Sequence, residues 1–384
     1  GIRDKLGTGV QTCALPILGE RQLVEIARTL DQQARIIILD EPNSALSEAE
    51  SQRLFDLVRR LRFRGMTILY VSHRLEEVFA LADQITVLRD GRFQSTRPVS
   101  RTTIPAVIAE MIGRSVEDLF PAAPTGAGPG PVVLEVRELS QTGRLGPVSF
   151  CARQGEIVGF AGLEGAGVDE LFRILFGLSS RTGGTIHVRG EPYDPGSPGA
   201  AIRAGLGLIP ESRREQGLMM EASIARNGTV LVLEQLRTRL GLVDAGAVAR
   251  MAHQFIQRLG IRCDSRDKQV ALLSGGNQQK VLLAKWLAIG PSILILNDPT
   301  RGVDVGAKRE IYELIRKLAA EGMTLLITSS EIEEILGLSD RIVVMARGGV
   351  VGEFPARAAD KAQLMTAMTG GIPGACVARP GGHE

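Results

Sequence analysis

The residues best suited to chemistry lie in the stretch Leu273–Lys280, which reads LSGGNQQK. The hydroxyl of Ser274 and two glycines, Gly275 and Gly276, stand at the start of an apolar segment of helical character. At such a start, bare backbone N–H groups and the positive end of the helix dipole attract a polyphosphate. The stretch therefore predicts an anion site.

Polar pairs follow two apolar runs of the sequence. Asn297 and Asp298 come directly after the run Ser292–Leu296, and Asp40 and Glu41 come after Arg35–Leu39. The length and β-branched content of both runs are typical of buried parallel strands. Open α/β sheets place ligands and Mg²⁺ at the carboxyl ends of such strands, whereas a solvated strand end is the simpler interpretation.

A glycine-rich loop follows a third buried run, Glu156–Ala161. Its glycines are Gly162, Gly165 and Gly167, and a helix is expected from Leu171 to Phe176. Strand, glycine loop and helix in this order form the usual setting of a phosphate-binding loop, or P-loop, in which small residues let backbone N–H groups surround phosphates.

The same loop lacks the side chains that hydrolysis needs. A P-loop that cleaves a nucleoside triphosphate carries a lysine for the β- and γ-phosphates and a hydroxyl for Mg²⁺. Val168 stands at the lysine position and Asp169 at the hydroxyl position. We expect slow or purely structural nucleotide binding there at most.

The elements that position these residues occur twice. An offset of 257 residues places Gly19 on Gly276 and Asp40 on Asn297, and the register continues without a gap to Gly91 on Gly348. Such self-similarity indicates an internal duplication. The first copy is expected to lack its front half, and its expected elements are helices over 21–30, 49–62, 75–82 and 104–111 and strands over 35–39, 67–71, 85–88 and 92–95.

The domain boundaries follow from the repeat and from composition. Residues 1–17 have no periodicity and resemble the translation of a sequencing-library adapter, so we exclude them from the fold. The first domain is expected over 18–118 and the second over 132–370. Residues 119–131 are rich in proline and glycine and are typical of a linker, and 371–384 are expected to be a disordered tail.

The composition limits the class of protein. The 45 basic and 43 acidic residues nearly balance, which argues against a broad nucleic-acid binder. No run approaches 18 apolar residues, so no membrane span is expected. The four cysteines are far apart and form no metal-like pair, which favours a reduced, cytosolic compartment.

The order of these motifs resembles the nucleotide-binding domains of ABC transporters, with their signature loop, Walker B strand and D-loop. More closely, nearly everything after residue 17 resembles the two-domain ATPase subunit of bacterial ribose, galactose and xylose importers. The resemblance implies an α/β fold with tandem P-loop ABC-type nucleotide-binding domains, the first one incomplete. It also implies ATP and Mg²⁺ as cofactors, transmembrane permease subunits and an extracytoplasmic sugar-binding protein as partners, and a peripheral place on the cytoplasmic face of the membrane.

The resemblance also implies roles for individual residues. Asp40 would hold Mg²⁺, Glu41 would orient or deprotonate water, and His73 would be the switch histidine. In the second domain, Ser274 to Gln278 would contact nucleotide, and Glu211 would lie in the Q-loop, where many members have glutamine.

Nucleotides in this family are held between the P-loop of one domain and the signature loop of the other. The resemblance therefore implies one competent site, since Asn297 and Ser330 replace the aspartate and histidine of the second domain. The chain as written, without a first P-loop, is expected to hydrolyse essentially no ATP.

Two other interpretations stay open. A soluble twin ATPase acting on ribosomes or nucleic acid would usually carry a long charged linker, whereas this linker is short and neutral. A non-catalytic fragment without independent function is compatible with the importer interpretation. The sugar itself is not readable, because the substrate does not touch this subunit, so ribose, galactose, xylose, rhamnose or a polyol are all possible.

Overall fold

The computed structural model describes residues 28, 34–43, 48–72, 75–89, 91–113, 120–121 and 130–370. The adapter-like segment 1–17, the expected helix over 21–30 apart from Arg28, and the expected tail 371–384 lie outside these residues. The chain divides into two compact units, Gly1–Val116 and Glu117–Glu384, called unit 1 and unit 2 below.

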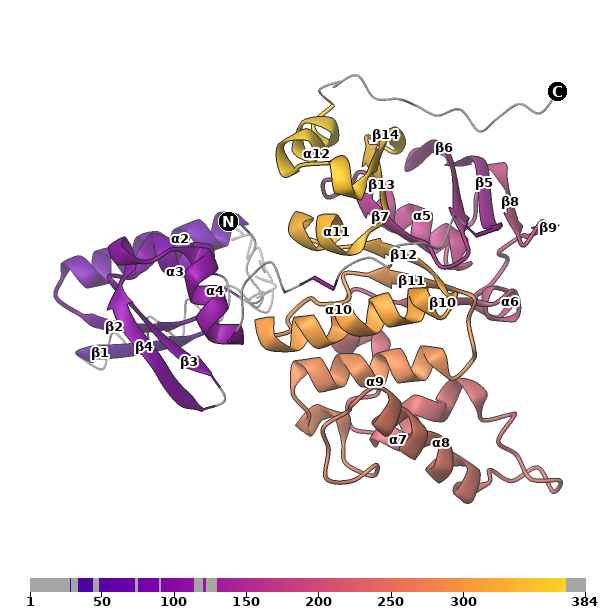
Figure 1. Ribbon diagram of the computed structural model, residues 1–384, viewed down its shortest axis with the longest axis horizontal. Coiled ribbons are helices and arrows are strands. Elements are labelled where there is room, and N and C mark those ends of the chain that lie inside the picture. The colour runs from indigo at the N-terminus through magenta and orange to yellow at the C-terminus, as the bar shows by residue number, and fades with distance from the viewer. Residues whose placement is uncertain are drawn as a thin grey trace, which may run out of the picture. The chain divides into compact units, whose positions relative to one another are not determined.

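Unit 1 is built from two pairs of strands and the helices that cover them (Figure 1). The first two strands pair in parallel, and the next two pair antiparallel. Its elements are β1 (Ile36–Asp40), α2 (Glu48–Phe63), β2 (Thr67–Val71), α3 (Leu75–Leu81), β3 (Gln84–Arg89), β4 (Arg92–Pro98), η1 (Val99–Arg101) and α4 (Ile104–Ile112).

The strand β1 shows why unit 1 has a one-sided core. Its side chains alternate between faces, as in any strand. Ile37 and Leu39 are buried in a cluster with α2 residues such as Leu54, whereas Ile36 and Ile38 are 59% and 67% exposed. Helix α2 therefore covers one face of the β1–β2 pair.

Unit 2 contains a six-stranded sheet in the order β10-β11-β12-β7-β13-β14. All neighbours are parallel except β13 and β14. The strands β7, β11 and β12 are buried on both faces, as near-continuous apolar runs predict. The six strands are β7 (Ile157–Ala161), β10 (Leu206–Ile209), β11 (Ile293–Asn297), β12 (Thr324–Thr328), β13 (Arg341–Ala346) and β14 (Gly349–Pro355).

A second, antiparallel sheet in unit 2 has the order β6-β5-β8-β9. Its strands are β5 (Val132–Gln141), β6 (Leu145–Arg153), β8 (Gly183–Val188) and β9 (Glu191–Pro192).

The helices of unit 2 are α5 (Val168–Leu175), α6 (Pro198–Arg203), α7 (Ile224–Thr229), α8 (Ala245–Arg258), α9 (Gly275–Leu287), α10 (Val305–Ala320), α11 (Ile332–Leu338) and α12 (Lys361–Met368). Short helical turns occur at η3 (Arg213–Gly217), η4 (Val230–Val232), η5 (Val270–Leu272) and η6 (Ala356–Ala358). Figure 1 shows α9 and α10, both orange, running side by side.

The two units repeat the same elements at the offset of 257 residues found in the sequence. The bounds of β1, α2, β2, α3, β3 and β4 become those of β11, α10, β12, α11, β13 and β14. The register repeats too, since Ile36 pairs with Thr67 and Ile293 with Thr324. Even the irregularity after Val87 in β3 returns after Val344 in β13.

The predicted elements within the described residues are confirmed, with shifts at their ends. Helix α9 begins at Gly275, directly after Ser274, as expected, and its apolar pattern starts six residues later at Val281. A Cβ at Gly276 would meet the Cβ of Ala307 on α10, so the glycine permits a close helix contact rather than ending the helix. Among the residues that the structure describes, no helix combines the length and apolar character of a membrane span.

Candidate functional site

Three loops of unit 2 meet at one edge of the six-stranded sheet. The parallel strands β7, β12 and β11 are neighbours, so the segments that follow them leave the sheet on the same side. These segments begin at Gly162, Ser329 and Asp298. The structure therefore brings together the predicted P-loop, the switch segment and the polar pair after β11.

The P-loop of unit 2 has the tight backbone that its glycines predict. Gly165 and Gly167 take φ values of 79° and 100°, which side chains other than glycine rarely adopt. A Cβ at Gly162 would overlap Ala166. The carbonyl of Ala166 accepts a hydrogen bond of 3.0 Å from the N–H of Gly348, which anchors the loop to the β13–β14 turn.

The side chains at this loop do not fit the hydrolysis of Mg²⁺-bound ATP. Val168 opens α5 and brings no cation, and the Nδ2 of Asn297 donates a 3.1 Å hydrogen bond to the Oδ1 of Asp169. An amide thus stands at the position that corresponds to Asp40 of unit 1, and it bonds to the carboxylate opposite it. The loop therefore has the glycine backbone of a P-loop, whereas its side chains at 168 and 169 are valine and aspartate.

Asp298 follows Asn297 in a strained conformation. Its φ is 48°, and its N–H donates to the carbonyl of Thr328 at 2.9 Å. Burial raises the pKa of its carboxyl to about 6, and the charges of Glu334 and Glu331 add to the rise. A carboxyl with this pKa titrates under mildly acidic conditions.

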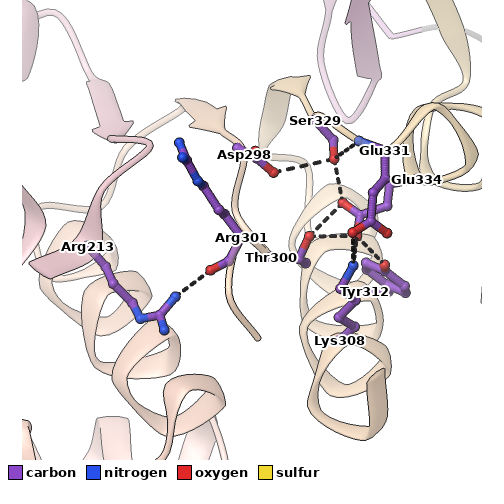
Figure 2. Close-up of polar contacts among 9 residues, drawn as sticks. All are labelled: Arg213, Asp298, Thr300, Arg301, Lys308, Tyr312, Ser329, Glu331 and Glu334. Atoms are coloured by element: carbon purple, nitrogen blue, oxygen red, sulfur yellow. Dashed lines mark hydrogen bonds and ion pairs between the residues drawn. The ribbon is translucent and has the colours of Figure 1, made fainter. Parts of the chain in front are cut away.

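A buried acid holds the loops around Asp298 in place (Figure 2). Glu334 on α11 is 1% exposed and accepts hydrogen bonds from Thr300 at 2.6 Å and Ser329 at 2.8 Å. Tyr312 and Lys308, both on α10, donate to the same carboxylate at 2.6 Å and 2.9 Å. One carboxylate thereby joins the loop after β11, the loop after β12 and helix α10.

Lys308 supplies the charge that this buried acid needs. It pairs with Glu334 and also with Glu331 at 2.5 Å. Burial alone would lower the pKa of Lys308, but the two carboxylates raise it above its ordinary value. The lysine therefore stays charged inside unit 2.

The signature stretch keeps its helix start free of side-chain capping. Ser274 is the N-cap residue of α9, yet its side chain makes no cap hydrogen bond, and its Oγ instead accepts from the Nδ2 of Asn277 at 2.9 Å. Gly275 and Gly276 then form the first turn. The side chain of Ser274 therefore does not cap the backbone N–H groups of this turn.

The side chain of Gln278, a predicted nucleotide-binding residue, lies inside the protein. It is 1% exposed, and its Nε2 donates to the carbonyl of Leu273 at 2.9 Å. Its Oε1 accepts from the Nε of Arg213 at 3.2 Å. Both ends of the amide are thus hydrogen-bonded within the protein, so Gln278 connects the signature stretch to Arg213.

Arg213 is a structural residue that the sequence analysis missed. Besides Gln278, it donates to the carbonyl of Arg301, as Figure 2 shows. It also donates to the carbonyl of Gly302 at 2.9 Å. Burial lowers the pKa of its guanidinium. Glu211, the predicted Q-loop residue, forms an ion pair with Arg301. The signal was an arginine two residues after Glu211, but nothing in the sequence pointed to its acceptors.

In unit 1, the predicted residues Asp40 and Glu41 are exposed at the end of β1. Glu41 has a φ of 45°, and its N–H donates to the carbonyl of Val71 at 2.8 Å, which repeats the backbone of Asp298. His73 lies outside the described residues. No preformed cluster of three or more metal-ligating side chains occurs in the described ranges. Mg²⁺ does not require one, because it is usually bound by one or two carboxylates together with phosphates.

Comparisons with known proteins agree with this arrangement. A family model described as "ABC transporter" matches residues 145–301. The ribose import ATP-binding protein of Rhodococcus jostii is 43% identical over 367 residues, which cover 96% of this chain and 71% of that protein. A ribose import ATP-binding protein of Rubrobacter xylanophilus is 45% identical over 95% of this chain and 70% of its own length.

A third relative is named for other sugars besides ribose. A putative ribose/galactose/methyl galactoside import ATP-binding protein of Rhizobium meliloti is 44% identical and covers 92% of this chain and 70% of that protein. Among solved structures, a nucleotide-free ATP-binding cassette from an ABC transporter matches with a TM-score of 0.52 at 19% identity, over 59% of this chain and 92% of that chain. The ADP conformation of another cassette matches with a TM-score of 0.52 at 18% identity, over 62% of this chain and 95% of that one. These structures show the α/β fold of an ABC ATPase with a P-loop domain.

Proposed function

The chain belongs to the ATP-binding subunits of bacterial ABC-type monosaccharide importers, and we propose that it powers the import of ribose or a related monosaccharide or polyol through a single hydrolytic site. The observation that carries the single-site proposal is the contrast between Asp40 and Glu41 in unit 1 and Asn297 and Asp298 in unit 2. The backbone repeats, whereas the metal-holding acid is present in only one copy.

In unit 1, Asp40 would hold Mg²⁺ and Glu41 would orient or deprotonate the attacking water. Both carboxylates are exposed at the carboxyl end of a parallel strand, so they fit the metal and nucleotide. Bound Mg²⁺-ATP supplies the phosphoryl group and the charge neutralisation of its oxygens. His73, which follows β2 in the sequence, would act as the switch residue of the same site.

In unit 2, the signature residues Ser274, Gly275 and Gly276 would contact the polyphosphate through their backbone, and the P-loop glycines Gly162, Gly165 and Gly167 would bind nucleotide without cleaving it. The hydrogen bond between Asn297 and Asp169 supports this role, because it engages the carboxylate that would otherwise face a metal. Glu211 and Gln278 would position loops rather than touch nucleotide, since both are engaged within the protein.

We extend the proposal to organisation and partners. Tandem nucleotide-binding domains, over 18–118 and 132–370 with a linker at 119–131, are supported by the shared element bounds of the two units. Transmembrane permease subunits and an extracytoplasmic sugar-binding protein would be the partners, and the chain would lie peripherally on the cytoplasmic face of the membrane. The relatives are import ATP-binding proteins, which favours this role over that of a factor acting on ribosomes or nucleic acid.

The proposal is tested in a transporter assembled from the permease and a form of this chain to which a lysine-bearing P-loop segment has been joined ahead of residue 18, so that ATP hydrolysis is measurable. Glu41→Gln is expected to lower the hydrolysis rate by about 100-fold or more, because it removes the carboxylate next to the attacking water. Asp298→Asn is the matched control at the equivalent position and is expected to change the rate less than about twofold. Equal losses in both variants would contradict the single-site proposal.

A second measurement concerns the purified chain alone. The sequence contains one P-loop-like segment, Gly162–Asp169, with valine at the lysine position. We propose that the chain alone hydrolyses essentially no ATP, since its P-loop-like segment has no lysine to bind the γ-phosphate. Hydrolysis by the purified chain at ordinary transporter rates would refute this part. Uptake assays with ribose, galactose, xylose and rhamnose then identify the sugar.

A further inference from the structure

We propose that Tyr312 and Gly337 form a docking site on unit 2 for one aromatic side chain, and that Phe120 occupies it as an anchor for the segment entering unit 2. We further infer that this anchor positions the loops after β11 and β12 through Glu334. The importance of those loops for nucleotide rests on the proposed function, whereas the docking itself does not.

Phe120 has the geometry of an anchored side chain. Its ring stacks on the ring of Tyr312, with centroids 5.1 Å apart and an angle of 21° between the planes. Tyr312 is completely buried, and Phe120 packs against the main hydrophobic core although its surroundings in the sequence are rich in proline and glycine. Stacked pairs of this kind contribute beyond the area that they bury.

Gly337 supports a site built for that ring. It lies inside α11, where a glycine weakens the helix relative to alanine, and its φ is not positive. Backbone conformation therefore does not explain it. A Cβ at this position would overlap the ring of Phe120, with Cδ2 only 2.6 Å away. The glycine is explained by the close approach of the phenylalanine.

The equivalent positions of unit 1 lack both features. The offset of 257 residues places Phe55 at the position of Tyr312 and Ala80 at that of Gly337. The methyl group of an alanine would overlap the docked aromatic ring. A phenylalanine at the tyrosine position has no hydroxyl that could donate a hydrogen bond to the buried acid on the neighbouring helix. The docking site is thus a property of unit 2.

The hydroxyl of Tyr312 connects the docked ring to the loops. It donates to Glu334 at 2.6 Å, and the same carboxylate accepts from Thr300 and Ser329. Figure 2 shows Tyr312, Glu334, Thr300 and Ser329 converging on this point. A displacement of Tyr312 would therefore reach both loops through one acceptor.

A double-mutant cycle on the full chain tests the docking. Trp286 is the only tryptophan and lies on α9, so its fluorescence follows the unfolding of unit 2 in urea. Phe120→Ala and Gly337→Ala are each expected to raise the unfolding equilibrium constant about tenfold. In the Phe120→Ala background, Gly337→Ala is expected to lower that constant, because only the gain in helix propensity remains.

The reverse pattern would overturn the proposal. If Gly337→Ala stabilises unit 2 equally in both backgrounds, the glycine does not seat the ring. Phe63→Ala is the matched control, because Phe63 is 94% exposed, and it is expected to leave the Trp286 transition unchanged.

Hydrogen exchange tests the positioning of the loops. Phe120→Ala is expected to accelerate exchange of the amides in 298–304 and 329–334 at least tenfold relative to the rest of unit 2. Phe120→Tyr, which keeps the stacking, should restore slow exchange, whereas Phe120→Leu should not. Uniform acceleration throughout unit 2 would show that Phe120 stabilises without positioning. None of these measurements uses nucleotide or transport, so they stand or fall separately from the proposed function.

Discussion

The two units use one backbone framework for different polar chemistry. Glu41 and Asp298 share a positive φ, of 45° and 48°, and each donates its N–H to the end of the neighbouring strand. Around them the side chains differ, since Asp40 in unit 1 corresponds to Asn297 in unit 2. Strained backbone at such a position is usually tied to function. Its presence in unit 2 indicates that the loop geometry is kept even where asparagine stands in place of the aspartate of unit 1.

The buried acids of the two units show the same division. Glu77 in unit 1 accepts from Tyr70 at 3.0 Å and from Ser72 at 3.3 Å, and Ser72 corresponds to Ser329 of unit 2. Unit 2 adds Lys308, where unit 1 has Ser51. Unit 2 therefore has a buried ion pair at a position where unit 1 has the small hydroxyl of a serine.

The largest expected effect tests that ion pair. Lys308→Met should destabilise unit 2 by about 3–5 kcal/mol, because it leaves Glu334 charged and buried without its lysine. Urea unfolding followed by Trp286 fluorescence measures the change. The neighbouring Arg309→Met is the control, since Arg309 pairs only with the half-exposed Glu313 at 2.9 Å, and it should change stability by less than about 1 kcal/mol. Equal effects would show that Lys308 is no more than a surface cation.

Arg213 offers the next test, because it joins the signature stretch to the loop after β11. Arg213→Ala should destabilise unit 2 by about 2 kcal/mol, since it removes three hydrogen bonds of a partly buried guanidinium. Arg214→Ala removes the same charge from an exposed neighbour and should be nearly neutral. Hydrogen exchange at 274–278 and 300–303 should rise in the first variant only. Unchanged exchange there would refute its role as a junction.

Restoring the lost side chains sharpens the comparison of the two sites. The triple variant Val168→Lys, Asp169→Ser and Asn297→Asp should raise the affinity of the purified chain for Mg²⁺-ATP about tenfold or more, because it supplies the cation, hydroxyl and acid of a working P-loop. Equilibrium binding of a fluorescent ATP analogue measures it. Val168→Ile is the control without charge. If the triple variant binds no better, features other than these three side chains block the site.

The smallest effect concerns pH. The pKa of Asp298 is about 6 in the folded protein, above its unfolded value near 4, so the folded state binds the extra proton. This group therefore contributes stability that is fully present below about pH 4 and is lost as pH rises through about 6. Relative to the wild type, Asp298→Asn should have a flatter decline of stability over that window. Parallel pH profiles of the two proteins would contradict the raised pKa.

The sequence by itself determined the elements and their duplication. Periodicity and turn residues act locally, so the strands Thr67–Val71 and Ile293–Asn297 could be placed to within a residue, and the offset of 257 residues predicted which elements would repeat. It also showed which positions carry acids and glycines, and that valine occupies the lysine position of the P-loop. These are properties of neighbouring positions in the chain.

Only the tertiary structure decided which polar side chains meet one another and hold the loops in place. Arg213 donates to acceptors that lie 65 to 89 residues farther along the chain. Gln278 belongs to the signature stretch in the sequence, yet its side chain is buried inside the protein. Phe120 meets Tyr312 of α10 and approaches Gly337 of α11, both about 200 residues farther along the chain. Contacts of this kind depend on how the sheet orders its strands, and side-chain direction within a loop is not a periodic property. The sequence therefore predicted the framework, and the folded chain assigned the polar partners.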